Sequence, residues 1–265
     1  MAKNNKYWKS FAATAEDRKL AKAGTDPLEE GLKDLGWFAN SRRIVRQKLQ
    51  KTRESFGEEV GNSITSGIFA AYLLGMLPFA SVTAYLRSNG NILSVVGLSA
   101  FVIGLFLALL ITTIYHFMKH GTNQKRVMHK INRISIYYAI LGGYTPVCIA
   151  FLNPVSGAVI FALEAALAIA GTLVTALTYP KYSVGTGFAN FIFYLMAWLI
   201  VFDMGEFHRN ADPRCFWLII SGLIVLTVGT IFYSGKRFKF SHMVWHFFVL
   251  AGGILHVLGF VYFFG

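Results

Sequence analysis

The sequence predicts an all-α integral membrane protein with seven transmembrane helices, and composition and segment length carry the prediction. Of 265 residues, 55% are hydrophobic and only 14% are charged, whereas soluble domains carry about 25% charged residues. Seven apolar stretches follow Asn62, each close to the ~20 residues that cross ~30 Å of hydrocarbon. The predicted spans are 64–86, 93–118, 134–152, 154–178, 184–203, 215–234 and 242–264.

The start of the chain differs from the rest. Residues 1–57 hold more than half of the 25 Lys and Arg residues and no long apolar run. We therefore divide the chain into a basic cytoplasmic segment, 1–57, and a transmembrane domain, 58–265. Because residues 1–9 are polar and basic, we expect no cleavable signal peptide. Residues 41–56 indicate a basic helix on the anionic inner leaflet, and a solvated, partly disordered tail is the alternative.

Turn residues and loop charges order and orient the spans. Asn153 and Pro154 separate the third span from the fourth, since proline suits the start of a helix. Lys and Arg concentrate in cytoplasmic loops, so the distribution of charge predicts a cytoplasmic N-terminus and an outside C-terminus. The loops assigned to the inside carry Lys119, Lys125, Arg126, Lys130, Arg133, Lys181, Lys236, Arg237 and Lys239, against only Arg87, Arg209 and Arg214 outside.

Three histidines fall at the inner surface of this arrangement. His116 ends the second span, and His242 and His246 begin the seventh, four residues apart and therefore on one helical face. Ionisable groups at membrane depth are costly and usually functional. Three imidazoles from two helices can hold a zinc ion and leave its fourth position open, as in catalytic zinc sites. Interfacial histidines that hydrogen-bond only to headgroups or backbone are the alternative.

Other residue patterns exclude some functions. The basic excess flanks apolar spans, so nucleic acid is not an expected partner. The chain has two cysteines, Cys148 and Cys215, and lacks the spacing of a zinc finger. We expect two buried free thiols, and a disulfide near the outer face is the alternative. Glu164 is the one acidic residue deep inside a span, and His256 is a candidate partner; alternatively both are neutral and hydrogen-bonded between helices.

Three separated motifs give the chain a family resemblance. They are EVGN at Glu59–Asn62, TTIYH at Thr112–His116 followed by Asn132, and SHMVWH at Ser241–His246. With seven spans, they resemble the hemolysin III branch of the progestin and adipoQ receptor family, membrane proteins with an intramembrane zinc site. The resemblance covers residues 58–264 and includes Tyr144-Thr-Pro146 in the third span. It implies that His116, His242 and His246 are the zinc ligands.

The resemblance also implies a reaction, and three residues depart from the family pattern. The family is expected to hydrolyse lipid amides of the ceramide type, with an aspartate acting on the water where this chain has Asn132. It usually has histidine in place of Ser66, and serine in place of Thr112. Asparagine can orient a water but cannot accept its proton. The candidate catalytic residues are therefore Asn132 and Thr112, which position the water, and Glu59 as a substitute base. For Thr112 the alternative is a hydrogen bond to a carbonyl of its own helix. For Glu59 the alternative is a local role, capping its helix or contacting Asn62.

The leading function is a zinc-dependent hydrolase of a membrane lipid amide or ester, in a cell membrane that we take as a bacterial cytoplasmic one. A non-catalytic sensor or receptor with structural zinc is the first alternative. A pore-forming or cytolytic protein is the second, although a pore calls for charged residues along several spans.

Overall fold

The computed structural model describes residues 55–119, 122–177, 184–235 and 240–264. The predicted basic helix over 41–56 lies outside the described residues except for its last two positions. The basic loop residues Lys181, Lys236, Arg237 and Lys239 also lie outside them.

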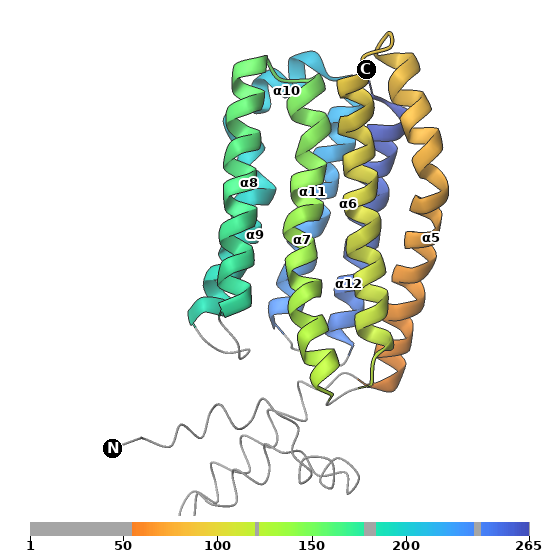
Figure 1. Ribbon diagram of the computed structural model, residues 1–265, viewed down its shortest axis with the longest axis vertical. Helices are drawn as coiled ribbons and strands as arrows, with labels where there is room; N and C mark the ends of the chain where they lie inside the picture. The colour runs from red at the N-terminus through yellow and green to blue at the C-terminus, as the bar shows by residue number, and fades with distance from the viewer. Residues whose placement is uncertain (1–54, 120–121, 178–183, 236–239, 265) are drawn as a thin grey trace, which may run out of the picture.

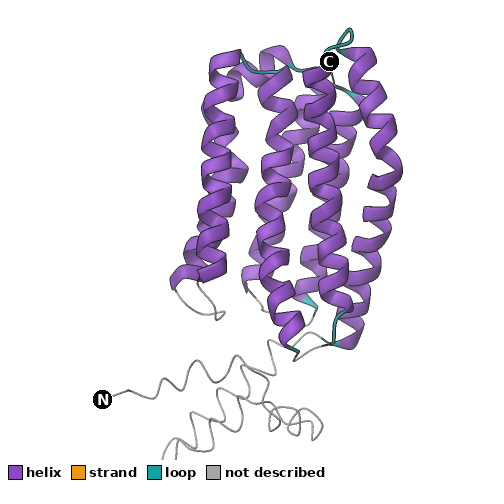
Figure 2. Cartoon of the chain, in the orientation of Figure 1, coloured by secondary structure: helices purple, strands orange, loops and turns teal. Residues whose placement is uncertain are grey.

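The described residues form a bundle of long helices, and they contain no strand (Figures 1 and 2). Among the described residues, six helical segments are long and apolar enough to cross a membrane, and α7 is not one of them. In chain order the helices are α5 (Phe56–Arg87), α6 (Ile92–Phe117), α7 (Asn123–Ala150), α8 (Pro154–Leu177), α9 (Val184–Trp198), η1 (Leu199–Asp203), α10 (Met204–Asn210), α11 (Pro213–Gly235), α12 (Ser241–Val257) and η2 (Leu258–Tyr262).

Two helices begin earlier than the apolar pattern predicts. α5 begins at Phe56 rather than residue 64, because Ser55 and Glu58 form a capping box that satisfies backbone N–H groups of the first turn. α7 begins at Asn123 rather than residue 134, because the Thr122 hydroxyl accepts from the Lys125 N–H at 3.1 Å. Both extensions are polar turns, so hydrophobicity alone places the helix starts too late.

The predicted span 184–203 is not one continuous α-helix. α9 passes at Leu199 into the 3₁₀ segment η1, and α10 continues to Asn210. Tyr144 bridges this change of helix type, because its hydroxyl donates to the Ala197 carbonyl at 3.3 Å and accepts from the Ile200 N–H at 2.9 Å. The side chain of α7 thus satisfies backbone groups that a regular helix would pair internally.

Small residues let neighbouring helices approach closely. A Cβ added at Gly157 of α8 would lie 2.3 Å from the Cys148 carbonyl oxygen of α7. A Cβ at Gly142 would lie 2.9 Å from the Ala100 carbonyl oxygen of α6. Such contacts let backbones pack where lipid gives little hydrophobic drive for association. Cys148 and Cys215 are both buried and free, as the sequence predicts.

The candidate ligands gather at one end of the bundle, which we call the histidine end. α5, α7 and α12 begin there and α6 ends there (Figure 1). The end of α5, the start of α11 and η2 lie at the opposite end. Residues from four chain-distant segments therefore reach one level of the bundle, as the order of spans predicts.

Candidate metal centre

The structure brings His116, His242 and His246 together. One ligand atom from each lies within 4.8 Å of the others, and within the described residues these three form the one such group of three or more. The Nε2 atoms of His116 and His246 are 3.0 Å apart. The rings of His242 and His246 stack with centroids 5.0 Å apart, as their four-residue spacing on α12 requires.

Two of the three rings are shielded by protein. His116 is 3% exposed and His246 is 6% exposed, whereas His242 is half-buried at the first turn of α12. This arrangement leaves the site closed on its α6 side and more open beside His242.

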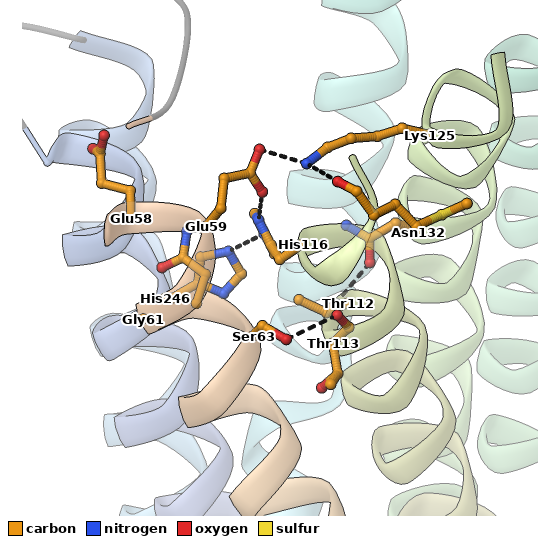
Figure 3. Close-up of polar contacts among 12 residues, drawn as sticks. Glu58, Glu59, Gly61, Ser63, Thr112, Thr113, His116, Lys125, Asn132 and His246 are labelled. Carbon is orange, nitrogen blue, oxygen red and sulfur yellow. Dashed lines mark hydrogen bonds and ion pairs between the residues drawn. The ribbon is translucent and has the colours of Figure 1, made fainter. Parts of the chain in front are cut away.

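Glu59 fixes the orientation of the His116 ring. The Nδ1–H of His116 donates to Glu59 Oε2 at 2.8 Å, and the other carboxylate oxygen accepts from Lys125 Nζ (Figure 3). A proton on Nδ1 leaves the Nε2 lone pair of neutral imidazole directed at His246. A carboxylate behind a histidine is the arrangement that orients metal ligands. The local alternative for Glu59 is not what these contacts show: Glu58 caps the helix, while Glu59 reaches across to His116 on α6 and Lys125 on α7.

Lys125 is the residue that sequence reasoning missed. It was counted only as a loop charge, yet it is 6% exposed and its ammonium also donates to the Met118 carbonyl at 3.1 Å. The start of α7 at Asn123 carries it over the site. Thr122 before a polar stretch is an N-cap signal that could have placed this helix start.

The side chains of Thr112 and Asn132 are within hydrogen-bonding distance of each other. Thr112 Oγ1 lies 2.7 Å from Asn132 Oδ1 and 2.8 Å from the Ala108 carbonyl oxygen. A hydroxyl has one proton, so it donates to one of these acceptors at a time. Both side chains lie beside His116, on the α6 and α7 side of the site (Figure 3).

Asn62 and Ser66 are buried polar residues next to Glu59 on α5. Both are 0% exposed, and neither the Asn62 amide nor the Ser66 hydroxyl has a hydrogen-bond partner in the described part of the chain. Helical spacing places Ser66 two turns from Glu59 on the same face. Buried polar groups without partners are uncommon and mark sites that a ligand or water can satisfy.

Within the described residues, Glu164 and His256 are not hydrogen-bonded to each other. The Nε2 of His256 lies 3.2 Å from the Ile219 carbonyl oxygen on α11, so its bond is between helices as the alternative expected. Glu164 is 0% exposed, and its carboxyl oxygens have no hydrogen-bond partner among the residues described. Neither residue belongs to the histidine group.

With this geometry in place, comparisons identify the family. The family model for haemolysin-III-related proteins matches residues 55–257. The chain belongs to this family. It is 26% identical over 211 residues to Hemolysin-3 of Bacillus cereus, covering 80% of this chain and 94% of that protein. It is 28% identical over 195 residues to a Hemolysin-3 homolog of Bacillus subtilis, covering 74% and 89%.

Family membership confirms the resemblance drawn from the three motifs. Together with the six apolar helical segments, it makes the chain a multi-pass membrane protein.

Proposed function

We propose that the histidine group holds zinc and that the protein is a zinc-dependent hydrolase of lipid amides or esters, of which ceramide-like amides are the leading class. The observation that carries the proposal is the convergence of His116, His242 and His246 at one end of a membrane bundle. Three imidazoles leave one position of a tetrahedral zinc ion open, as catalytic zinc sites do.

The donor set fits zinc in chemistry, and one pair of donors fits it in spacing. Two nitrogens at 2.0–2.1 Å from a tetrahedral zinc ion lie ~3.3 Å apart. The Nε2 atoms of His116 and His246 are 3.0 Å apart, close to that separation, while the ligand atoms of all three histidines lie within 4.8 Å of one another, so the group must contract to hold one ion. Imidazole suits zinc, copper, iron and nickel, and the open, three-histidine arrangement favours zinc among them.

Each neighbouring side chain has a role that its contacts support. Glu59 and Lys125 hold the His116 ring in one orientation. Thr112 and Asn132 position the water for attack from the α6–α7 side. When bound, zinc polarises the substrate carbonyl and activates water. Asn62 and Ser66 have side-chain polar groups without a hydrogen-bond partner among the described residues, and these groups can bind the polar part of a lipid that enters from the bilayer.

We also propose that the protein crosses the membrane seven times, with α7 as a crossing and the N-terminus in the cytoplasm. The positive-inside rule supports this orientation. The helix bounds place Lys119, Lys125 and Arg126 at the histidine end, and Arg87, Arg209 and Arg214 at the opposite end. The zinc site then lies just beneath the cytoplasmic face of a cell membrane, taken as a bacterial one.

Two measurements on the purified protein test the proposal. Metal analysis of wild type beside His242→Ala is expected to give near-equimolar zinc in the first and little in the second. Zinc-loaded protein is then incubated with lipid amides and esters, and released fatty acid is measured for wild type and Asn132→Asp. The metal site is refuted if wild type holds no zinc, and the hydrolase if neither form releases fatty acid.

A non-catalytic sensor with structural zinc is the second candidate, and Asn132 favours it. An asparagine at the position where the family has aspartate cannot take a proton from water. Structural zinc would lock α6 to α12, so His246→Ala would lower the melting temperature sharply. In a catalytic site the same change removes activity and leaves a folded bundle.

A further inference from the structure

The end of the bundle opposite the histidines carries a charged cavity. It has a volume of about 380 Å³ and is lined by Arg87, Asp212, Arg214, Tyr262 and Phe263. These residues come from the end of α5, the turn before α11, the first turn of α11, and η2 with the residue after it. The cavity therefore lies where three helical segments meet at the edge of the apolar spans.

An apolar groove adjoins this cavity. Its volume is about 410 Å³, and it is lined by Pro213, Arg214, Trp217, Leu218, Ser221 and Phe263. Arg214 and Phe263 line both hollows, so the two lie side by side. The groove follows α11 from Pro213 to Ser221, nine residues that span ~12 Å of helix. Trp217 is 60% exposed beside it, and tryptophan is enriched where apolar spans meet headgroups.

The cavity has a net positive charge. Two guanidinium groups face one carboxylate, which leaves one positive charge in excess. Arg87 donates to the Tyr262 carbonyl, and Arg214 stacks over the Phe263 ring at 4.3 Å. Hydrogen bonds from Arg214 lower the pKa of Asp212 to about 2, so Asp212 is ionised at neutral pH. Arginine has five N–H donors, and these contacts leave donors on both side chains for an anion.

We propose that this end of the protein binds an anionic phospholipid, with its phosphate between Arg87 and Arg214 and an acyl chain in the groove along α11. Arginine matches phosphate through paired hydrogen bonds. A charged cavity beside an apolar groove matches a molecule that is charged at one end and apolar along the rest. The bilayer supplies such a molecule at this depth, which is why we assign a lipid rather than free phosphate.

Asp212 restrains this site. Its carboxylate accepts from Arg214 Nη2 at 2.9 Å and from Nε at 3.1 Å, so it competes with a phosphate for the same donors. Removing its charge releases the guanidinium and raises the net charge from one to two. The two kinds of variant are therefore expected to change phospholipid affinity in opposite directions. Loss of an arginine weakens binding, and loss of the Asp212 charge strengthens it.

Native mass spectrometry of the full chain in detergent tests the proposal, with phosphatidylglycerol, phosphatidylcholine and inorganic phosphate as separate probes. Wild type is expected to retain phosphatidylglycerol over phosphatidylcholine. Arg87→Gln and Arg214→Gln are each expected to weaken phosphatidylglycerol binding about fivefold, and Asp212→Asn to strengthen it by a similar factor. Arg209→Gln is the matched control, because Arg209 is exposed on α10 and lines neither hollow.

Each outcome decides the proposal. Opposite changes for Arg87→Gln and Asp212→Asn, with Arg209→Gln unchanged, support it, and the gain cannot arise from misfolding. Equal retention of the two lipids, an equal loss for Arg209→Gln, or no gain for Asp212→Asn overturns it. Displacement of phosphatidylglycerol by millimolar inorganic phosphate also overturns it, because the site would then take free phosphate.

Discussion

Replacing Glu59 with glutamine is expected to weaken zinc binding 10- to 100-fold, although no ligand is changed. Mutating the residue that hydrogen-bonds to the second nitrogen of a metal-binding histidine typically weakens metal affinity by this factor, which corresponds to ~1.4–2.7 kcal/mol of binding free energy. Glutamine keeps an acceptor near His116 Nδ1, 2.8 Å from the present carboxylate oxygen. It loses the charge, and a charge-assisted hydrogen bond is about twice as strong as a neutral one.

A second effect acts in the same direction. Glutamine leaves the buried Lys125 ammonium, which pairs with Glu59, without an anion beside a bound cation. Removing one partner of a buried pair costs more than removing both. Glu59→Gln combined with Lys125→Met is therefore expected to bind zinc more tightly than Glu59→Gln alone.

Competition against a chromophoric zinc chelator in detergent measures these affinities. Glu58→Gln is the matched control, because Glu58 lies in the same turn and its carboxylate accepts from the Ser55 N–H at 2.7 Å. That control should bind zinc within about twofold of wild type, since its carboxylate touches no ligand. Unchanged affinity in Glu59→Gln, or an equal loss in Glu58→Gln, would refute the role of Glu59.

Three further predictions concern packing and charge away from the histidine group. Gly157→Ala should lower the melting temperature, because the added Cβ would lie 2.3 Å from a backbone oxygen of Cys148; an unchanged melt contradicts the packing. Glu164→Leu should raise stability by about 1–3 kcal/mol, measured by denaturation in mixed micelles, because it removes a buried carboxyl whose oxygens lack partners in the described chain; a loss would reveal a partner. The Asp212 pKa is lowered from 3.8 to about 2, so ionised Asp212 stabilises the folded protein fully above about pH 4, and this stabilisation is lost as pH falls through about 2. Melting curves of Asp212→Asn should lack that part of the acid destabilisation, and identical acid slopes would exclude it.

The sequence predicts the histidine group well because two strong regularities act together. The spacing of His242 and His246 fixes a shared helical face, and alternating spans return His116 to the same end. Both regularities are local or topological, so neither depends on details of packing.

Other features depend on packing that one sequence does not display. Leu199 to Asp203 is as apolar as its surroundings, so hydrophobicity does not reveal the 3₁₀ segment that Tyr144 supports. Lys125 appears as a loop charge until α7 is known to begin at Asn123. The first turns of that helix are polar and show no helical repeat of apolar residues, so only the N-cap residue indicates where the helix begins.

The position of acidic groups decides how the catalytic proposal is best tested. Both oxygens of Glu59 are engaged, one with His116 Nδ1 and one with Lys125, so it orients a ligand and is poorly placed to take a proton from water. Asn132 lies on the other side of His116, and its Oδ1 is 2.7 Å from the Thr112 hydroxyl. A carboxylate is an acceptor only, so Asn132→Asp keeps this hydrogen bond and adds a base. The substitution should therefore raise lipid hydrolysis without changing zinc content. If neither zinc-loaded wild type nor zinc-loaded Asn132→Asp hydrolyses lipid, a structural metal in a sensor is favoured instead.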